Sequence, residues 1–104
     1  MFRWLFRKTD EFDRSGKWPK VRALHLARQP DCQACGKVNC EMEVHHIQPY
    51  HEKPELELDP QNLCTLCADP CHLVHGHLMS WARINRDVLE DCTRYRSKLE
   101  AAKR

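Results

Sequence analysis

The feature that most constrains this chain is the crowding of cysteine and histidine in the middle of its sequence. The 104 residues include seven cysteines and seven histidines, and twelve of these fourteen lie between residues 32 and 77. An odd number of cysteines fits poorly with a complete set of internal disulfides. Mixed cysteine and histidine clusters are typical of metal sites, so we expect bound metal and a reducing compartment such as the cytoplasm.

Two cysteine pairs predict a structural zinc site. Cys32 and Cys35 are separated by two residues, and Cys67 and Cys71 by three. Zinc in structural sites takes four tetrahedral ligands, and two pairs on facing turns supply four thiolates. A chain of this length buries a modest core, so a zinc staple would contribute directly to folding.

A competing pair is Cys64 and Cys67, which has the tighter spacing usual in zinc knuckles. Cys64 lies inside a segment that is predicted to be a strand, and a thiol in mid-strand would not point toward a zinc knuckle. We therefore favour Cys67 and Cys71. We interpret Cys40 and Cys92 as core or incidental thiols, since free cysteine often behaves as a small buried hydrophobe.

Local patterns predict an α+β arrangement. A helix is expected from Pro19 to Pro30, strands over 42–47 and 62–66, and a short helix over 72–79. A longer helix is expected over about 80–102, because apolar residues recur there in steps of three and four. That stripe consists of Trp81, Ile84, Val88, Cys92, Tyr95 and Leu99.

We divide the chain into a basic arm (1–16) and one domain (17–104) with its core over about 32–79. Residues 1–30 carry eight Lys or Arg and three Asp or Glu, and residues 76–104 carry seven and four. Basic ends could contact a phosphate backbone, although an ordinary solvated surface explains them equally well. No apolar run approaches the roughly 20 residues of a membrane span, and the first residues do not resemble a signal peptide.

One set of residues between and after the cysteine pairs has a specific order. It consists of His45-His46-Ile47-Gln48-Pro49, then Asn62-Leu63, then Cys71-His72. This order resembles the HNH nuclease family over roughly residues 32–77, in the subgroup with a four-cysteine zinc. The resemblance implies a ββα-metal core: a two-stranded antiparallel hairpin and a helix, stapled by zinc. The helices expected from the local patterns would flank this core at its N- and C-terminal ends.

The resemblance also implies roles in DNA hydrolysis. His45 and His72 match the ligands of a catalytic divalent metal, His46 matches the general base, and Asn62 matches the residue that fixes the loop and orients that base. Histidine suits the role of base because it titrates near neutral pH. The metal could be Mg²⁺, Mn²⁺, Ni²⁺ or Zn²⁺. The implied substrate is double-stranded DNA, cut with weak sequence specificity to leave 5′-phosphate and 3′-hydroxyl ends.

Two departures from the family pattern concern the helix after Cys71. The second cysteine pair has one more intervening residue than usual, and the position four after His72 is Gly76. His75 and His77 flank this glycine, and each is a candidate for a metal or phosphate contact, with a surface position as the alternative. His51 is a further candidate for phosphate contact.

Other functions remain open from the sequence alone. The same scaffold could be a non-catalytic zinc-stapled module that binds nucleic acid, or an all-structural zinc module. A protein-interaction zinc finger is a third reading, in which Trp4, Trp18 or Trp81 would lie at an interface. We expect His25 at the surface or packed against its helix.

Overall fold

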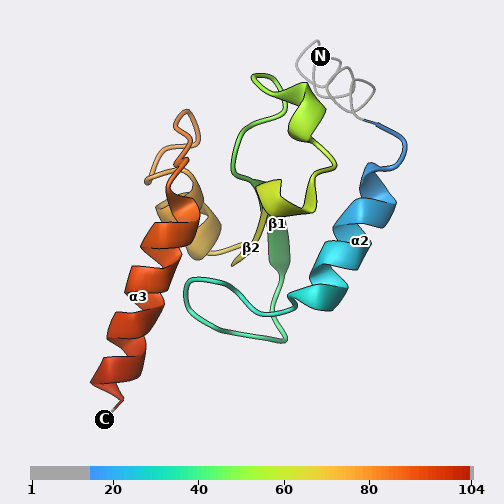
Figure 1. Cartoon of the computed structure of the whole chain (residues 1–104). Helices are drawn as coiled ribbons and strands as arrows, with labels where there is room; N and C mark the ends of the chain where they lie inside the picture. The colour runs from blue at the N-terminus through green and yellow to red at the C-terminus, as the bar shows by residue number, and fades with distance from the viewer. Residues whose placement is uncertain (1–14, 104) are drawn as a thin grey trace, which may run out of the picture.

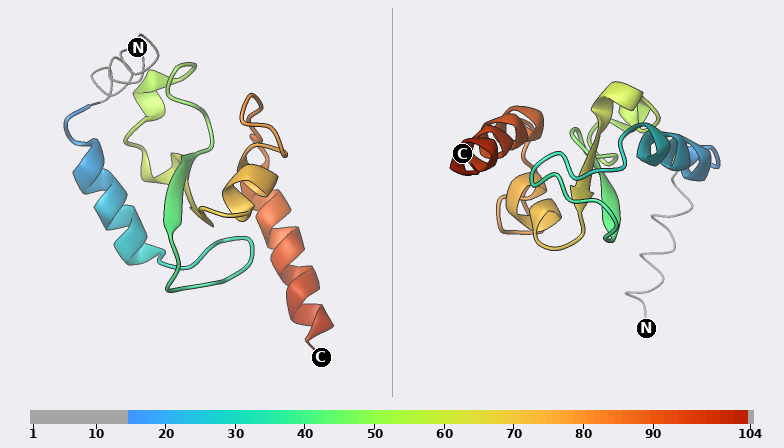
Figure 2. Two further views of the ribbon diagram at one scale, coloured as in Figure 1. Left: turned by 180° about the vertical axis from the view of Figure 1, so that it is seen from behind. Right: turned by 90° about the horizontal axis from the view of Figure 1, so that it is seen from below.

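A computed structural model describes residues 15–103, so the predicted arm (1–16) lies almost entirely outside the described residues. Helix α2 (Trp18–Arg28) is followed by strand β1 (Met42–His46), strand β2 (Leu63–Cys67) and helix α3 (Val88–Ala102) (Figure 1). The two helices lie on opposite sides of the strand pair (Figures 1 and 2). This arrangement confirms the predicted α+β class.

Helix α2 begins with a proline in its first turn, where the missing N–H costs no hydrogen bond. Helix α2 turns His25 inward, where it is buried, whereas Leu24 is 48% exposed. The end of α2 is tied to the sheet by Thr65, whose hydroxyl donates to the Gln29 carbonyl over 2.8 Å.

Strands β1 and β2 form an antiparallel pair in which His45 lies opposite Cys64 and His46 opposite Leu63. Every residue of β2 is buried. The loop between the strands contains two short 3₁₀ turns, Pro54–Leu56 and Pro60–Asn62. Asn62 therefore ends a 3₁₀ turn immediately before β2 instead of lying within the strand.

The helix expected over 72–79 is a single π-helical turn, η3 (His72–Gly76). It ends early because Leu78 and Met79 have φ angles of 53° and 72°. These left-handed values cannot continue a right-handed helix.

The C-terminal helix starts at Val88, so the expectation of a helix from about residue 80 was wrong. Asn85 explains the late start. Its backbone N–H donates to the Gly76 carbonyl, its side-chain amide donates to the His75 carbonyl, and its side-chain oxygen accepts from the Asp87 N–H. These bonds hold the chain before α3 in a turn, and they place Trp81 outside the helix.

The core that these elements enclose is small and rich in sulfur. Among residues 15–103, nine apolar residues are buried and five of them are cysteines. Such a core supplies little hydrophobic stabilisation by itself, which agrees with a fold that depends on a metal staple. Within the described part of the chain, no helix combines the length and apolar character needed to cross a bilayer.

Candidate functional site

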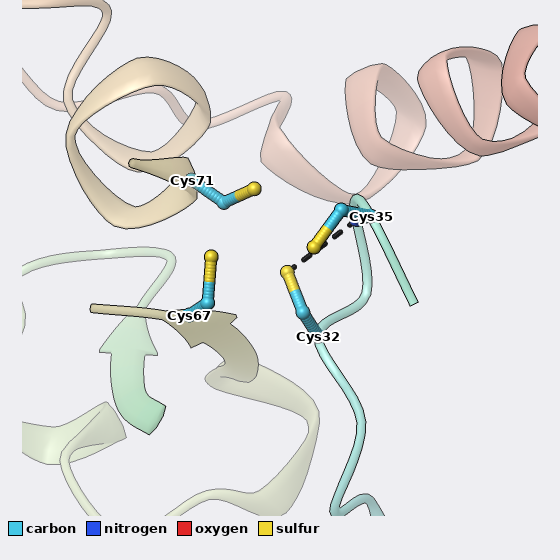
Figure 3. A group of neighbouring side chains, drawn as sticks. All are labelled: Cys32, Cys35, Cys67 and Cys71. Carbon is cyan, nitrogen blue, oxygen red and sulfur yellow. Dashed lines mark hydrogen bonds between the residues drawn. The ribbon is translucent and has the colours of Figure 1, made fainter. Parts of the chain in front are cut away.

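Four cysteine sulfurs lie close together. Cys32 and Cys35 come from the turn after α2, Cys67 ends β2, and Cys71 immediately precedes η3. The ligand atoms of Cys32, Cys35, Cys67 and Cys71 all lie within 4.8 Å of one another. Figure 3 shows their side chains pointing toward a common centre. A tetrahedral zinc with bonds of about 2.3 Å needs sulfurs about 3.8 Å apart, so this group fits the ion closely. The four cysteines are positioned to hold a metal.

The electrostatics of the four thiols also fit a bound cation. Burial, followed by the neighbouring thiols, raises the pKa of Cys71. At Cys32 burial acts in the same direction, but backbone N–H groups outweigh it and lower the pKa. One of these is the Cys35 N–H, which lies 3.5 Å from the Cys32 sulfur. The thiolate of Cys32 is therefore favoured, whereas a thiolate at Cys71 is disfavoured unless a cation neutralises it.

The remaining cysteines lie apart from this group. A hydrogen bond with Cys92, followed by burial, raises the pKa of Cys64, and the same bond lowers the pKa of Cys92. Both side chains are buried, whereas Cys40 is exposed. Cys64 therefore packs against α3 and does not compete with Cys71.

Helix α3 is attached to the first cysteine turn through Arg96. Its guanidinium forms an ion pair with Asp31 at 3.0 Å and donates to the Cys32 carbonyl over 3.4 Å. Gly36 ends this turn with a φ of 80°, and a Cβ there would lie 3.1 Å from the guanidinium. Glycine is therefore favoured by the backbone angle, and the absence of a side chain also leaves room for the Arg96 guanidinium.

A second group of ligand atoms consists of three histidines. Nε2 of His72 lies 3.2 Å from Nδ1 of His45 and 3.2 Å from Nε2 of His77. All three ligand atoms lie within 4.8 Å of one another. His45 comes from β1, His72 from the start of η3 and His77 from the residue after η3.

The π-helical turn determines which histidine joins this group. A π-helix bonds residue i to i+5, whereas an α-helix bonds i to i+4. Residue i+5 from His72 is His77, so the widened turn places this ring beside His72 and leaves Gly76 between them. His75 lies elsewhere, with its ring centroid 4.8 Å from that of Tyr95. The structure thus brings His77 to the group and does not bring His75.

Gly76 provides the space in which the rings approach each other. A Cβ at this position would lie 3.1 Å from Cε1 and Nδ1 of His45 and 3.2 Å from Cδ2 of His72. These distances are shorter than ordinary van der Waals contacts. The absence of a side chain at Gly76 therefore lets the rings of His45 and His72 occupy these positions without displacement.

Two members of the three-histidine group, His45 and His72, have the protonation state that metal ligation requires. Burial, followed by the neighbouring histidines, lowers the pKa of His45 to about 3. Burial and His77 lower the pKa of His72 to about 4. Both rings are neutral at pH 7, as metal ligands must be. The nitrogens of His45 and His72 that face each other are Nδ1 and Nε2, 3.2 Å apart, so these are the atoms that a shared cation would bind.

His46, next in the strand, has a different environment. Its Nε2 lies 2.9 Å from the Glu57 carbonyl oxygen. A carbonyl can only accept, so the proton is on Nε2 and the lone pair is on Nδ1. The imidazole packs against Trp18 with ring centroids 4.6 Å apart. These two contacts fix both the tautomer and the orientation of the ring.

Asn62 holds the loop that carries Glu57. Its side-chain N–H groups donate to the carbonyls of Gln48 and Leu56, each over 3.1 Å, and its side-chain oxygen accepts from the Gln48 N–H over 2.8 Å. Asn62 is buried, so all three bonds are shielded from water. Asn62 thus ties Gln48, two residues after His46, to the loop that contains Glu57.

A cavity of about 480 Å³ joins these features. His45, His46, His72 and His77 all line it, together with Trp18, Trp81, Arg22 and His51. The two adjacent histidines of β1 therefore open onto one space, although neighbouring residues of a strand point to opposite faces. His51 lies 3.8 Å from Glu52 with its side chain 75% exposed.

Three contributors to this site were not predicted from the sequence. The Glu57 carbonyl belongs to the backbone, so no residue type could signal it. Trp18 was read as a core or interface aromatic, and its position just before a helix gave no sign that it would meet His46. Trp81 was assigned to a helix face, whereas it lies beside the three-histidine group.

Comparison with known families agrees with this geometry. The family model described as HNH endonuclease matches residues 32–78, a segment that contains both ligand groups, His46 and Asn62. No curated protein and no solved structure shows a significant match to the chain.

Proposed function

We propose that this protein is a metal-dependent endonuclease that hydrolyses phosphodiester bonds in DNA, because residues 32–78 match the HNH endonuclease family model. One observation supports the proposal: three histidines positioned to share a cation line the same cavity as a fourth histidine whose Nε2–H donates to a carbonyl.

In the proposed reaction His46 is the general base. With Nε2–H donated to the Glu57 carbonyl, Nδ1 is the nitrogen that can accept a proton from water. The carbonyl also stabilises the imidazolium that forms. The activated water then attacks phosphorus, the bond to the 3′ oxygen breaks, and the products carry a 5′-phosphate and a 3′-hydroxyl.

His45, His72 and His77 would hold the catalytic cation, which supplies Lewis-acid stabilisation of charge on the phosphate and the leaving oxygen. Three imidazole donors suit Mn²⁺, Ni²⁺ or Zn²⁺ better than Mg²⁺, which prefers oxygen ligands. The four cysteines would hold a separate zinc with a structural role. Asn62 acts as a positioning residue, because it fixes the loop whose carbonyl orients the base.

We propose double-stranded DNA as a substrate, cut with weak sequence specificity. Incubation of the zinc-loaded protein with supercoiled plasmid and Mg²⁺, Mn²⁺, Ni²⁺ or additional Zn²⁺ tests the activity. Nicked or linear product is expected with at least one ion. The cut ends should be rejoined by DNA ligase, which requires a 5′-phosphate and a 3′-hydroxyl.

Two histidine variants make the experiment specific. His46→Ala should lower the cleavage rate by about 10²- to 10⁴-fold, the usual contribution of general-base catalysis. His75→Ala is the matched control, because it removes a nearby imidazole outside the cluster, and it should cleave at the wild-type rate. Equal rates for wild type and His46→Ala, or no cleavage with any ion, would contradict the proposal.

A further inference from the structure

Trp81 is an exposed tryptophan at the edge of the proposed active site. It lies in the segment between η3 and α3, and 60% of its surface is accessible. Its neighbours Leu78 and Met79 are also exposed, by 39% and 67%. Apolar side chains that gather on a surface usually mark a binding site, since their exposure to water is unfavourable.

The indole ring is in contact with the histidine group. Its centroid lies 5.2 Å from that of His72 and 4.9 Å from that of His77. Trp81 also lines the cavity that contains His46. A ligand stacked on this indole would therefore have its neighbouring atoms close to the reacting groups.

The segment that carries Trp81 is held by hydrogen bonds on both sides of the indole. The Ser80 N–H donates to the His77 carbonyl over 3.0 Å, and the Arg83 N–H donates to the Ser80 carbonyl over 2.9 Å. His77 Nδ1 lies 2.7 Å from the Arg83 carbonyl. The indole is thus presented by a fixed turn, which lowers the entropy cost of binding to it.

We propose that Trp81 is a stacking platform for a nucleobase, and that the preferred substrate is therefore DNA whose bases are unpaired near the scissile phosphate. In a duplex both faces of each base are covered by its neighbours, so only an unstacked base can meet an indole. Arg22, which lines the same cavity, supplies a cation for the backbone of that strand. This inference rests on the proposed nuclease function and names its substrate class.

DNA binding by the full zinc-loaded chain tests the inference independently of cleavage. Fluorescence anisotropy with a short oligothymidylate and with a matched duplex is measured in a His46→Ala background, so that the strands stay intact. Adding Trp81→Ala should weaken single-strand binding by about tenfold or more, as loss of one base–aromatic stack does, and should weaken duplex binding less. Trp81→Phe should retain most of the single-strand affinity, because it keeps an aromatic face.

Two controls separate stacking from support of the histidine rings. Tyr95→Ala removes another exposed aromatic, 38% accessible and in contact with His75, and should leave both affinities unchanged. Titration with Ni²⁺ should give the same affinity with and without Trp81→Ala. Equal loss for single strand and duplex together with weakened Ni²⁺ binding would assign Trp81 a purely structural role and overturn the inference.

Wild-type plasmid cleavage, measured in parallel, distinguishes this inference from the function on which it rests. Cleavage with unchanged single-strand affinity in Trp81→Ala would refute the platform and leave the nuclease standing, and would direct attention to a protein partner for Trp81. Selective loss of single-strand affinity without wild-type cleavage would support the platform and refute the nuclease.

Discussion

Replacement of Gly76 by alanine tests the packing of the histidine group with only a small effect on the rest of the fold. The added Cβ would lie 3.1 Å from the His45 ring and 3.2 Å from the His72 ring. Both rings must then move by a few tenths of an ångström. His45 is 3% exposed and has little freedom to do so.

The substitution has two opposing effects on the free energy of unfolding, one from helix propensity and one from overpacking. Its effect on metal affinity is only unfavourable. Alanine is favoured over glycine by about 1 kcal/mol in a helical turn, whereas overpacking costs about 1–3 kcal/mol. The free energy of unfolding should therefore fall by no more than about 2 kcal/mol. Disturbance of residues that orient metal ligands typically lowers metal affinity or activity by about 10- to 100-fold, and we expect a loss in that range.

Calorimetric titration of the zinc-loaded protein with Ni²⁺ measures the affinity, and thermal unfolding measures the stability. Gly16→Ala is the matched control, because a Cβ at Gly16 would meet nothing within 4 Å. It should bind Ni²⁺ as the wild type does. The steric argument is refuted if Gly76→Ala also binds Ni²⁺ with wild-type affinity and cleaves DNA at the wild-type rate.

Three further substitutions test other parts of the molecule. Cys71→Ser should lower the tightly bound zinc and the thermal stability strongly, whereas Cys40→Ser should change neither; equal zinc content in the two, measured by metal analysis, would contradict the four-cysteine site. Asn62→Ala should slow cleavage by about 10- to 100-fold with little change in KM, because it releases the loop that orients the base; a wild-type kcat would argue against this role. Burial, followed by Arg28, lowers the pKa of His25, so the unfolded state binds more protons than the native state below pH 6.5 and stability is lost as pH falls. His25→Leu should reduce the loss of stability that occurs as pH falls below about 6.5, measured in denaturant titrations, and an unchanged pH dependence would refute the argument.

The cysteine site illustrates what spacing and alternation can predict. Two close pairs indicate four ligands, and the position of Cys64 inside a strand pattern argues against it as a ligand. The structure places Cys64 against Cys92 and brings Cys71 to the group, as that reasoning expected. Both features depend on local geometry, which short sequence patterns encode well.

The histidine group illustrates what spacing and alternation cannot predict. Whether His75 or His77 reaches His72 depends on the width of one helical turn, and no short pattern distinguishes a π turn from an α turn. The start of α3 was misplaced for a related reason. The apolar stripe continued through Trp81, but the hydrogen bonds of Asn85 hold that segment in a turn.

Anomalous diffraction from crystals of the zinc-loaded protein soaked in Mn²⁺ tests the central claim most directly. The account predicts two separate metal positions: zinc among the four cysteine sulfurs, and a second ion bonded to nitrogens of His45, His72 and His77 in the cavity lined by His46. A single metal position, or a second ion that lacks His77, would contradict it.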